Sequence, residues 1–153
     1  MNKNDLHILR VTRKNILELL DDCTYEQICQ VPQGFSNSIL WNFGHIAIVQ
    51  QLLIYALSGK EMLIDKATVD LFRKGQTGKE IIPEEEYNRL KNKFISLVDS
   101  LENDYADLSN KEYSAYTTSY NITLNSLDEA IAFNNTHEAV HFGIMMAQRK
   151  IIQ

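Results

Sequence analysis

The chain has 153 residues, of which 44% are hydrophobic and 23% are charged, with six glycines and two prolines. This composition excludes an intrinsically disordered chain and argues against a turn-rich β fold, so we expect one helical domain spanning residues 1–153. The formal net charge is −5, and the lysines and arginines are scattered along the chain. This charge pattern argues against nucleic acid as a partner.

The sequence predicts a cytoplasmic protein that does not cross a membrane. The N-terminal residues carry charges of both signs and lack the apolar core of a signal peptide. The longest apolar run, from Ile46 to Leu57, is interrupted by two glutamines and is too short to span a bilayer, so we expect a buried helix there. Cys23 and Cys29 match no C-x-x-C motif, and we interpret both as reduced thiols.

Two amphipathic helices are predicted in the first half of the chain. The first spans residues 3–22. Its apolar stripe consists of Leu6, Leu9, Arg10, Arg13, Ile16, Leu17 and Leu20. The second begins after a polar cap at Ser36 or Asn37 and ends at Leu57, before the stop signal of Gly59. Its inward stripe consists of Trp41, His45, Ile48, Val49 and Leu52.

A long connection and a third helix follow. Residues 59–83 contain three glycines and one short periodic piece at residues 67–73, which is typical of a connection with a helical turn or two. Pro83 and the three glutamates after it suit the first turn of a helix. We expect this helix to end near Leu108.

A fourth helix completes the chain. Residues 109–125 are rich in Ser, Thr, Asn and Tyr, which indicates a second connection that is partly extended. Ser126 then caps a helix that ends near Ile151. Its inward face consists of Ala130, Asn134, His137, His141, Ile144 and Gln148.

Four helices of about 20 residues, each about 30 Å long, predict an all-α four-helix bundle. The connection between the second and third helices is about 24 residues, enough to run the length of the bundle, so these two helices are expected to be parallel. The predicted order of helix directions is therefore up-down-down-up.

Two histidines in the last predicted helix suggest a metal site. His137 and His141 are four residues apart, so both imidazoles point from one helix face toward a shared ion. With Glu138 they also match the H-E-x-x-H pattern of zinc proteases, in which the glutamate is the general base. The spacing alone leaves both functions open. The residues after His141 include no His, Asp or Glu to supply a downstream third ligand, which disfavours the protease.

A third histidine, His45, lies on the inward stripe of the second predicted helix. Three imidazoles and one open position form the usual catalytic arrangement of zinc. Burying imidazoles without partners costs on the order of 1 to 3 kcal/mol for each unsatisfied group, and a shared ion removes that cost. We expect one divalent metal ion at this site. The residues do not determine whether it is zinc, nickel, iron or manganese.

These motifs resemble the DinB/YfiT-like proteins of the DinB superfamily. The shared features are the Trp41-x-x-Gly-His45 start of the second helix, the H-x-x-x-H pair of the fourth, and Gly143 two residues after that pair. The resemblance covers nearly the whole chain and implies a four-helix bundle with one divalent metal on His45, His137 and His141. A glutamine commonly follows the late glycine in this family, whereas this chain has Ile144.

The resemblance also implies a class of activity and an assembly. The family includes metal-dependent hydrolases and low-molecular-weight thiol S-transferases, so a small-molecule substrate, including a thiol, is expected. In these enzymes the metal activates a water or a thiol as the nucleophile. A homodimer is expected as well. The alternative is a non-catalytic bundle, in which the metal fastens the second helix to the fourth or the apolar faces build a dimer.

Three further residues are candidates for the surroundings of the metal. Asn134 lies one turn before His137 and either orients an imidazole through its second ring nitrogen or is a polar residue at the end of the bundle, which is the commoner case. Trp41 either lines a substrate pocket or packs in the core, which is the commoner fate of such an aromatic residue. Glu138 lies about 100° around the helix from His137, and we interpret it as a solvated or interhelical carboxylate. The loop tyrosines Tyr113, Tyr116 and Tyr120 have no assigned role.

Overall fold

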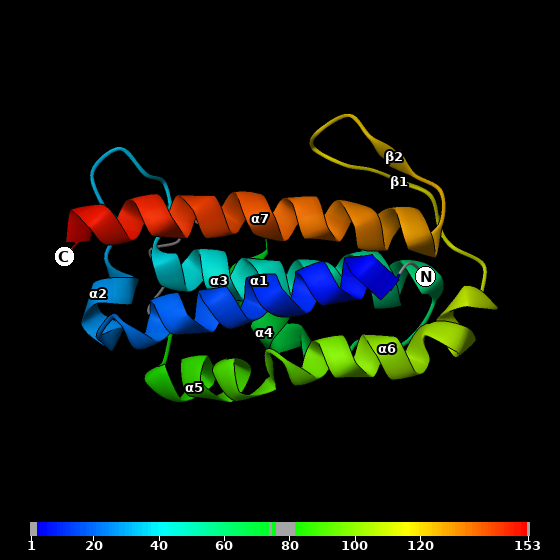
Figure 1. Ribbon diagram of the computed structural model, residues 1–153, viewed down its shortest axis with the longest axis horizontal. Helices are drawn as coiled ribbons and strands as arrows, with labels where there is room; N and C mark the ends of the chain where they lie inside the picture. Colours follow the sequence, from blue (N-terminus) through cyan, green and yellow to red (C-terminus); the bar gives the residue numbers. More distant parts are fainter. Residues whose placement is uncertain (1–2, 74, 76–81, 153) are drawn as a thin grey trace.

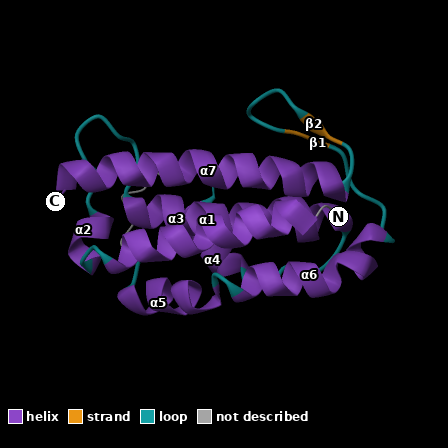
Figure 2. Cartoon of the chain, in the orientation of Figure 1, coloured by secondary structure: helices purple, strands orange, loops and turns teal. Residues whose placement is uncertain are grey.

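The computed structural model describes residues 3–73, 75 and 82–152. The helices are α1 (Lys3–Asp21), α2 (Tyr25–Cys29), α3 (Ile39–Gln50), α4 (Lys66–Phe72), α5 (Glu84–Lys93), α6 (Ser96–Ser109) and α7 (Leu127–Ile152). A π-helical turn, η1 (Gln51–Tyr55), and a 3-10 turn, η2 (Ala56–Ser58), continue α3. Strands β1 (Tyr116–Thr117) and β2 (Thr123–Leu124) form a small antiparallel hairpin. The fold is all-α apart from this hairpin (Figure 2).

The helices form a bundle with the predicted order of directions. Helices α1 and α7 run one way along the long axis, whereas α3 and the α5–α6 pair run the other way (Figure 1). The order is therefore up-down-down-up, as the long connection between the second and third predicted helices indicated. Part of that connection forms α4, and its residues 74 and 76–81 lie outside the described residues.

Serine caps fix the starts of the two helices that carry the histidines. The Ser38 hydroxyl accepts a hydrogen bond from the Trp41 amide at 3.1 Å, so α3 begins slightly later than the predicted caps Ser36 and Asn37. The Ser126 hydroxyl accepts from the Glu129 amide at 3.3 Å, which confirms the predicted cap of the last helix.

The third predicted helix is two helices, which corrects the expectation of one continuous helix from Pro83 to Leu108. The break lies between α5 and α6, at residues 94–95. The Phe94 carbonyl accepts a hydrogen bond from the Arg13 guanidinium at 2.7 Å. The Val98 amide, which pairs with the Phe94 carbonyl in a regular helix, donates to Ile95 instead. A tertiary contact has therefore replaced one bond of the helical ladder.

The short helix α2 was not predicted from the sequence. Its signal is present as a capping box, in which Thr24 accepts from the Gln27 amide and the Gln27 side chain accepts from the Thr24 amide. Five residues are too few to show a helical period of apolar residues, so apolar spacing does not reveal this helix.

The segment Ile39–Ser58 is long and apolar enough to cross a membrane by length and composition. In the structure it is the central helix of the bundle, and 83% of its most apolar stretch is buried. Burial inside the protein accounts for its composition, as the sequence analysis expected. Gly59 ends the segment with a positive φ of 66°, which glycine adopts without strain.

Candidate metal centre

The three predicted histidines lie together inside the bundle. His45 comes from the middle of α3, and His137 and His141 come from successive turns of α7. One nitrogen from each ring contributes to a cluster whose members all lie within 4.8 Å of one another. The structure therefore brings together three residues that are separated by up to 96 positions in the chain.

The backbone of α4 sets the orientation of His45. Its Nδ1 lies 2.8 Å from the carbonyl oxygen of Phe72, the last residue of α4. A carbonyl oxygen only accepts hydrogen bonds, so this contact places the proton of the neutral ring on Nδ1. The lone pair is then on Nε2, the form in which an imidazole binds a metal.

Gly44 makes this contact possible. A Cβ atom at Gly44 would lie 2.2 Å from Cδ1 of the Phe72 ring. The Phe72 ring therefore packs directly on the backbone of α3, next to His45. This position brings the Phe72 backbone carbonyl within hydrogen-bond distance of the imidazole. In the Gly-His pair of the sequence motif, the glycine therefore leaves the space for the residue that orients the histidine.

Asn42 orients His141 in the same way. The Asn42 Oδ1 atom lies 2.7 Å from Nδ1 of His141. The Asn42 amide nitrogen donates to the Ser38 carbonyl at 2.8 Å and to Gln148 at 3.2 Å, which fixes Oδ1 as the atom that faces the ring. His141 consequently carries its proton on Nδ1 and its lone pair on Nε2.

His137 has no such partner. Its Nδ1 atom is buried and lacks a hydrogen bond to any described residue. Burial, with smaller contributions from His141 and His45, lowers the pKa of His137 to about 3, and burial beside His45 lowers the pKa of His141 to about 4. Both rings are therefore neutral at pH 7, as metal ligands must be. An orphaned buried nitrogen beside two oriented imidazoles fits a bound divalent cation.

Glu138 is an interhelical carboxylate, one of the two predicted alternatives. Both of its oxygens accept from Arg13 of α1, at 2.7 Å and 3.1 Å, and both side chains are fully buried. Asn134 donates to Glu138 at 2.9 Å and makes no hydrogen bond to an imidazole that the structure shows. Because Arg13 occupies both carboxylate oxygens, Glu138 does not have the geometry of a protease general base.

Trp41 packs in the core against the metal centre. Its ring stacks on the His45 ring with centroids 4.4 Å apart and an angle of 13° between the planes, and only 5% of the residue is exposed. Trp41 does not border the cavity described below. It restricts the rotation of His45, and this role supports the core interpretation.

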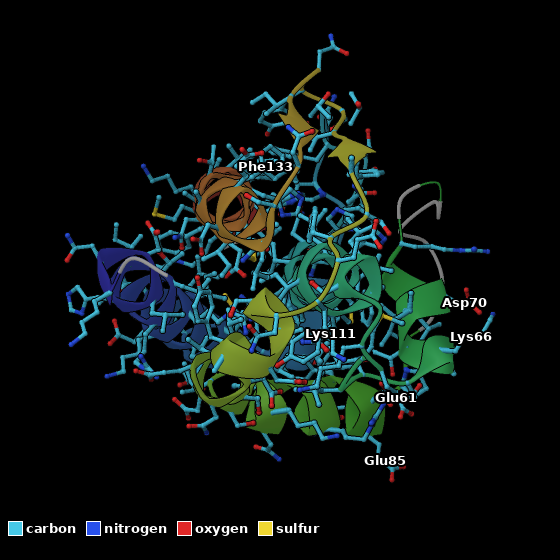
Figure 3. The ribbon with its side chains drawn as sticks, turned by 90° about the vertical axis from the view of Figure 1, so that its right-hand side faces the viewer. Glu61, Lys66, Asp70, Glu85, Lys111 and Phe133 are labelled. Carbon is cyan, nitrogen blue, oxygen red and sulfur yellow. The ribbon has the colours of Figure 1, made fainter. Side chains whose placement is uncertain are left out.

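A cavity of about 500 Å³ opens beside two of the histidines. His45 and His137 border it, together with apolar residues of the α3–η1–η2 segment, Phe133 of α7, Arg73, and residues 116–119 of the hairpin. Figure 3 shows Phe133 on α7 directly below the hairpin, and the Phe133 ring contacts Tyr120 at 5.5 Å between centroids. This volume suits a small molecule.

Sequence reasoning missed two of the groups that hold the ligands. Asn42 lies within the Trp41-x-x-Gly-His45 motif of the second helix, and its position three residues before His45 was a usable signal. The Phe72 carbonyl left no signal, because every residue has a backbone carbonyl. Tyr116, left without a role, borders the cavity.

One comparison with known proteins identifies a family for the chain. A search of curated proteins finds no match to the chain. The family model of the DinB superfamily matches residues 8–145, a range that includes all three histidines, Gly44 and Asn42. The chain therefore belongs to the DinB superfamily.

Proposed function

We propose that the protein is a divalent-metal enzyme that acts on a small molecule bound in the cavity. One observation carries this proposal: His45 and His141 hold their lone pairs on Nε2, and with His137 they offer ligand nitrogens within 4.8 Å of one another, next to the cavity that His45 and His137 border. A divalent cation held there lowers the pKa of a thiol or a water that binds to it and so supplies a nucleophile at neutral pH.

We propose transfer of a low-molecular-weight thiol as the reaction. None of the described residues that border the cavity is a carboxylate, and Glu138 is held by Arg13, so the site offers no evident general base for water. A thiol needs only to lose its proton to solvent. Its sulfur then bonds to an electrophilic carbon of a second substrate, whose leaving group departs with the bonding electron pair. Metal-dependent hydrolysis is the second candidate.

The test compares the two reactions in the same protein. The chain is loaded with zinc, nickel, iron or manganese and incubated with cysteine or glutathione plus 1-chloro-2,4-dinitrobenzene, or with p-nitrophenyl acetate alone. Thiol transfer predicts metal-dependent formation of the dinitrophenyl thioether, which a chelator abolishes. His137→Ala and His141→Ala should lose both bound metal and turnover. Ester cleavage without thioether formation would favour the hydrolase, and unchanged metal content in both variants would overturn the metal site.

A structural metal is the second candidate role for the site. His45 comes from α3 and the other two histidines from α7, so a shared ion fastens these helices together. Thermal unfolding before and after chelation separates the roles. A structural ion predicts extensive unfolding on chelation, whereas our proposal predicts loss of turnover with the helical circular dichroism retained.

We also propose that the protein forms a homodimer through the outward face of α7. Between Glu129 and Arg149 the only charged side chain of α7 is Glu138, which is buried. The outward face of this helix is therefore uncharged over about five turns. Its exposed residues are Ala132, Thr136, Ala139, Val140, Gly143, Met146 and Ala147. An uncharged helix face of this length suits a second copy of the same helix.

We place this activity in the cytoplasm. Cys23 and Cys29 are both free thiols in the structure, although they are only six residues apart. Free thiol pairs are typical of reducing compartments, where a low-molecular-weight thiol substrate is also kept reduced. Cell fractionation with an antibody to the chain tests this placement.

A further inference from the structure

The cavity is a groove that leads away from the metal centre along one face of the α3–η1–η2 segment. Its floor consists of Ile48, Val49, Leu52, Leu53, Ala56 and Leu57, which repeat at helical spacing after His45. Leu57 lies twelve positions after His45, which corresponds to roughly 18 Å at a helical rise of 1.5 Å per residue. The floor is apolar along its whole length, so it suits an extended apolar chain.

Arg73 gives the groove a charged group near the histidine cluster. The Phe72 carbonyl accepts the hydrogen bond from His45, so Arg73, the next residue, lies close to the histidine cluster and borders the groove. Among the described residues that border the groove, Arg73 is the one with a permanent charge. A guanidinium binds carboxylates and phosphates through paired N–H groups.

The contact between Arg73 and Asp70 does not prevent this role. The Arg73 Nε atom lies 3.5 Å from Asp70, and both side chains are well exposed, at 59% and 38%. An exposed ion pair at this distance contributes little. Asp70 also receives a shorter contact of 2.6 Å from Lys66. An anionic ligand can therefore engage the guanidinium without breaking a strong interaction.

From this arrangement we propose that the groove selects an amphipathic anion, with its anionic head on Arg73 beside the metal centre and a single apolar tail over Leu52 and Leu53 toward Leu57. The proposal rests on the proposed function in one respect, because it identifies this groove as the place where the substrate binds. It names the class of that substrate: a short fatty acid or an arylalkyl acid bearing the reacting carbon near its head.

Isothermal titration calorimetry with the full-length chain tests the proposal, both loaded with zinc and after chelation. The probes are octanoate, octan-1-ol, which keeps the tail without the charge, and butyrate, which keeps the charge with a shorter tail. We expect octanoate to bind at least about tenfold more tightly than either of the others, because only octanoate satisfies both ends of the groove. Arg73→Met should remove most of the preference for octanoate over octanol, and Arg73→Lys should keep part of it.

Lys66→Met is the matched control. Lys66 lies at the start of α4, which Arg73 directly follows, and contacts the same Asp70, but it is 86% exposed and points away from the bundle (Figure 3). This variant should bind octanoate within about twofold of the parent chain. Ala56→Trp, which fills the far part of the groove, should weaken octanoate binding and leave butyrate unchanged.

Two outcomes would overturn the proposal: equal binding of octanoate and octanol, or equal loss of octanoate binding in Arg73→Met and Lys66→Met. The metal-dependent thioether reaction of the parent chain is measured separately, so neither result decides whether that reaction occurs. If that reaction is present without a preference for anions, the substrate class is wrong and the proposed function stands. If octanoate binds as expected but no metal is retained, the groove stands and the proposed function fails.

Discussion

Arg13 and Glu138 form a bidentate ion pair in the centre of the bundle, although 125 residues separate them in the chain. Glu138 lies between the two histidines of α7, so the pair fixes the rotation of α7 about its own axis at the level of the metal centre. Gln50 and the Phe94 carbonyl accept the remaining contacts of the guanidinium. The ion pair therefore joins α1, α3, α7 and the α5–α6 junction.

Breaking this ion pair should destabilise the fold strongly. Glu138→Gln leaves the Arg13 charge buried without its counter-ion, and we expect a loss of about 3 to 5 kcal/mol in the free energy of unfolding. Urea denaturation measures this loss. The double variant Arg13→Met/Glu138→Gln should lose less than the sum of the single changes, because no unpaired charge remains.

Arg10→Met is the control for this prediction. Arg10 pairs with Asp99 and Glu102 on the surface, and its loss should cost no more than about 1 kcal/mol. Equal losses in Arg10→Met and Glu138→Gln would contradict the importance assigned to the buried pair.

Two asparagines near the histidines should separate metal affinity from stability. Asn42→Ala removes the group that orients His141, and we expect zinc affinity to fall by about 10- to 100-fold. Asn134→Ala removes a contact to Glu138 and should lower the unfolding free energy by about 1 to 3 kcal/mol, with zinc affinity largely retained. A chelator competition assay on folded protein compares the two. A greater loss of zinc affinity in Asn134→Ala would reverse the assignment.

The two glycines of the histidine motifs should respond oppositely to alanine. At Gly44 the added Cβ atom collides with the Phe72 ring, so we expect a loss of about 1 to 3 kcal/mol and weaker zinc binding through His45. At Gly143 a Cβ atom meets nothing within 4 Å, so Gly143→Ala should stabilise α7 by up to about 1 kcal/mol. Thermal unfolding and zinc titration of both variants check the pair, and an unaffected Gly44→Ala protein would refute the close packing.

The stability of the metal-free protein should fall as the pH is lowered from about 6.5 toward 4. The pKa values of His137 and His141 are about 3 and 4 in the folded chain, whereas an unfolded histidine titrates near 6.5. Between these values the unfolded chain binds more protons, so each histidine reduces stability by up to about 1.4 kcal/mol per pH unit. Above pH 6.5 neither contributes a slope.

Urea denaturation at a series of pH values, in the presence of a chelator, measures this dependence. The double variant His137→Asn/His141→Asn should show a much shallower slope between pH 6.5 and 4. His7→Gln, which changes an exposed histidine of α1 and leaves the buried histidines in place, is measured alongside as the control variant. The same steep slope in the double variant would assign the effect to other groups.

A charge on the outward face of α7 should break the proposed dimer without unfolding the chain. Val140 is 42% exposed on this face, and Val140→Glu would bury one unpaired carboxylate from each chain in the proposed symmetric interface. We expect light scattering to report a monomer for Val140→Glu and a dimer for Ile122→Glu, a comparable change at an exposed hairpin residue. A parent chain that is already monomeric would reject the dimer.

Local signals predicted most of the bundle because they lie close together in the sequence. The first and last helices follow from apolar periodicity and the Ser126 cap, and their observed bounds differ from the predicted ones by one residue. The break at residues 94–95 was not predictable in this way, because its cause is Arg13, far away in the chain. The π-helical end of the second helix was also missed, because its apolar residues have ordinary helical spacing.

The candidate site was likewise predictable from the sequence only in part. The three histidines follow from residue type, spacing and the family resemblance. The groups that fix their protons are the Asn42 side chain, which reaches His141 from a different helix, and the Phe72 backbone carbonyl, and of the two only Asn42 lies within a sequence motif. Glu138 forms an ion pair with Arg13, which is distant in the sequence, so the spacing within the last helix left its role open.

The π-helical turn η1 lies between the two ends of the groove. A π turn contains more residues per turn than an α turn, so it sets the angle between the helix face that carries His45 and the face that carries Ala56 and Leu57. Deleting one residue within η1 would rotate the far floor of the groove while leaving the histidine cluster in place. A change at this turn would therefore alter the shape of the proposed groove without changing the three histidines.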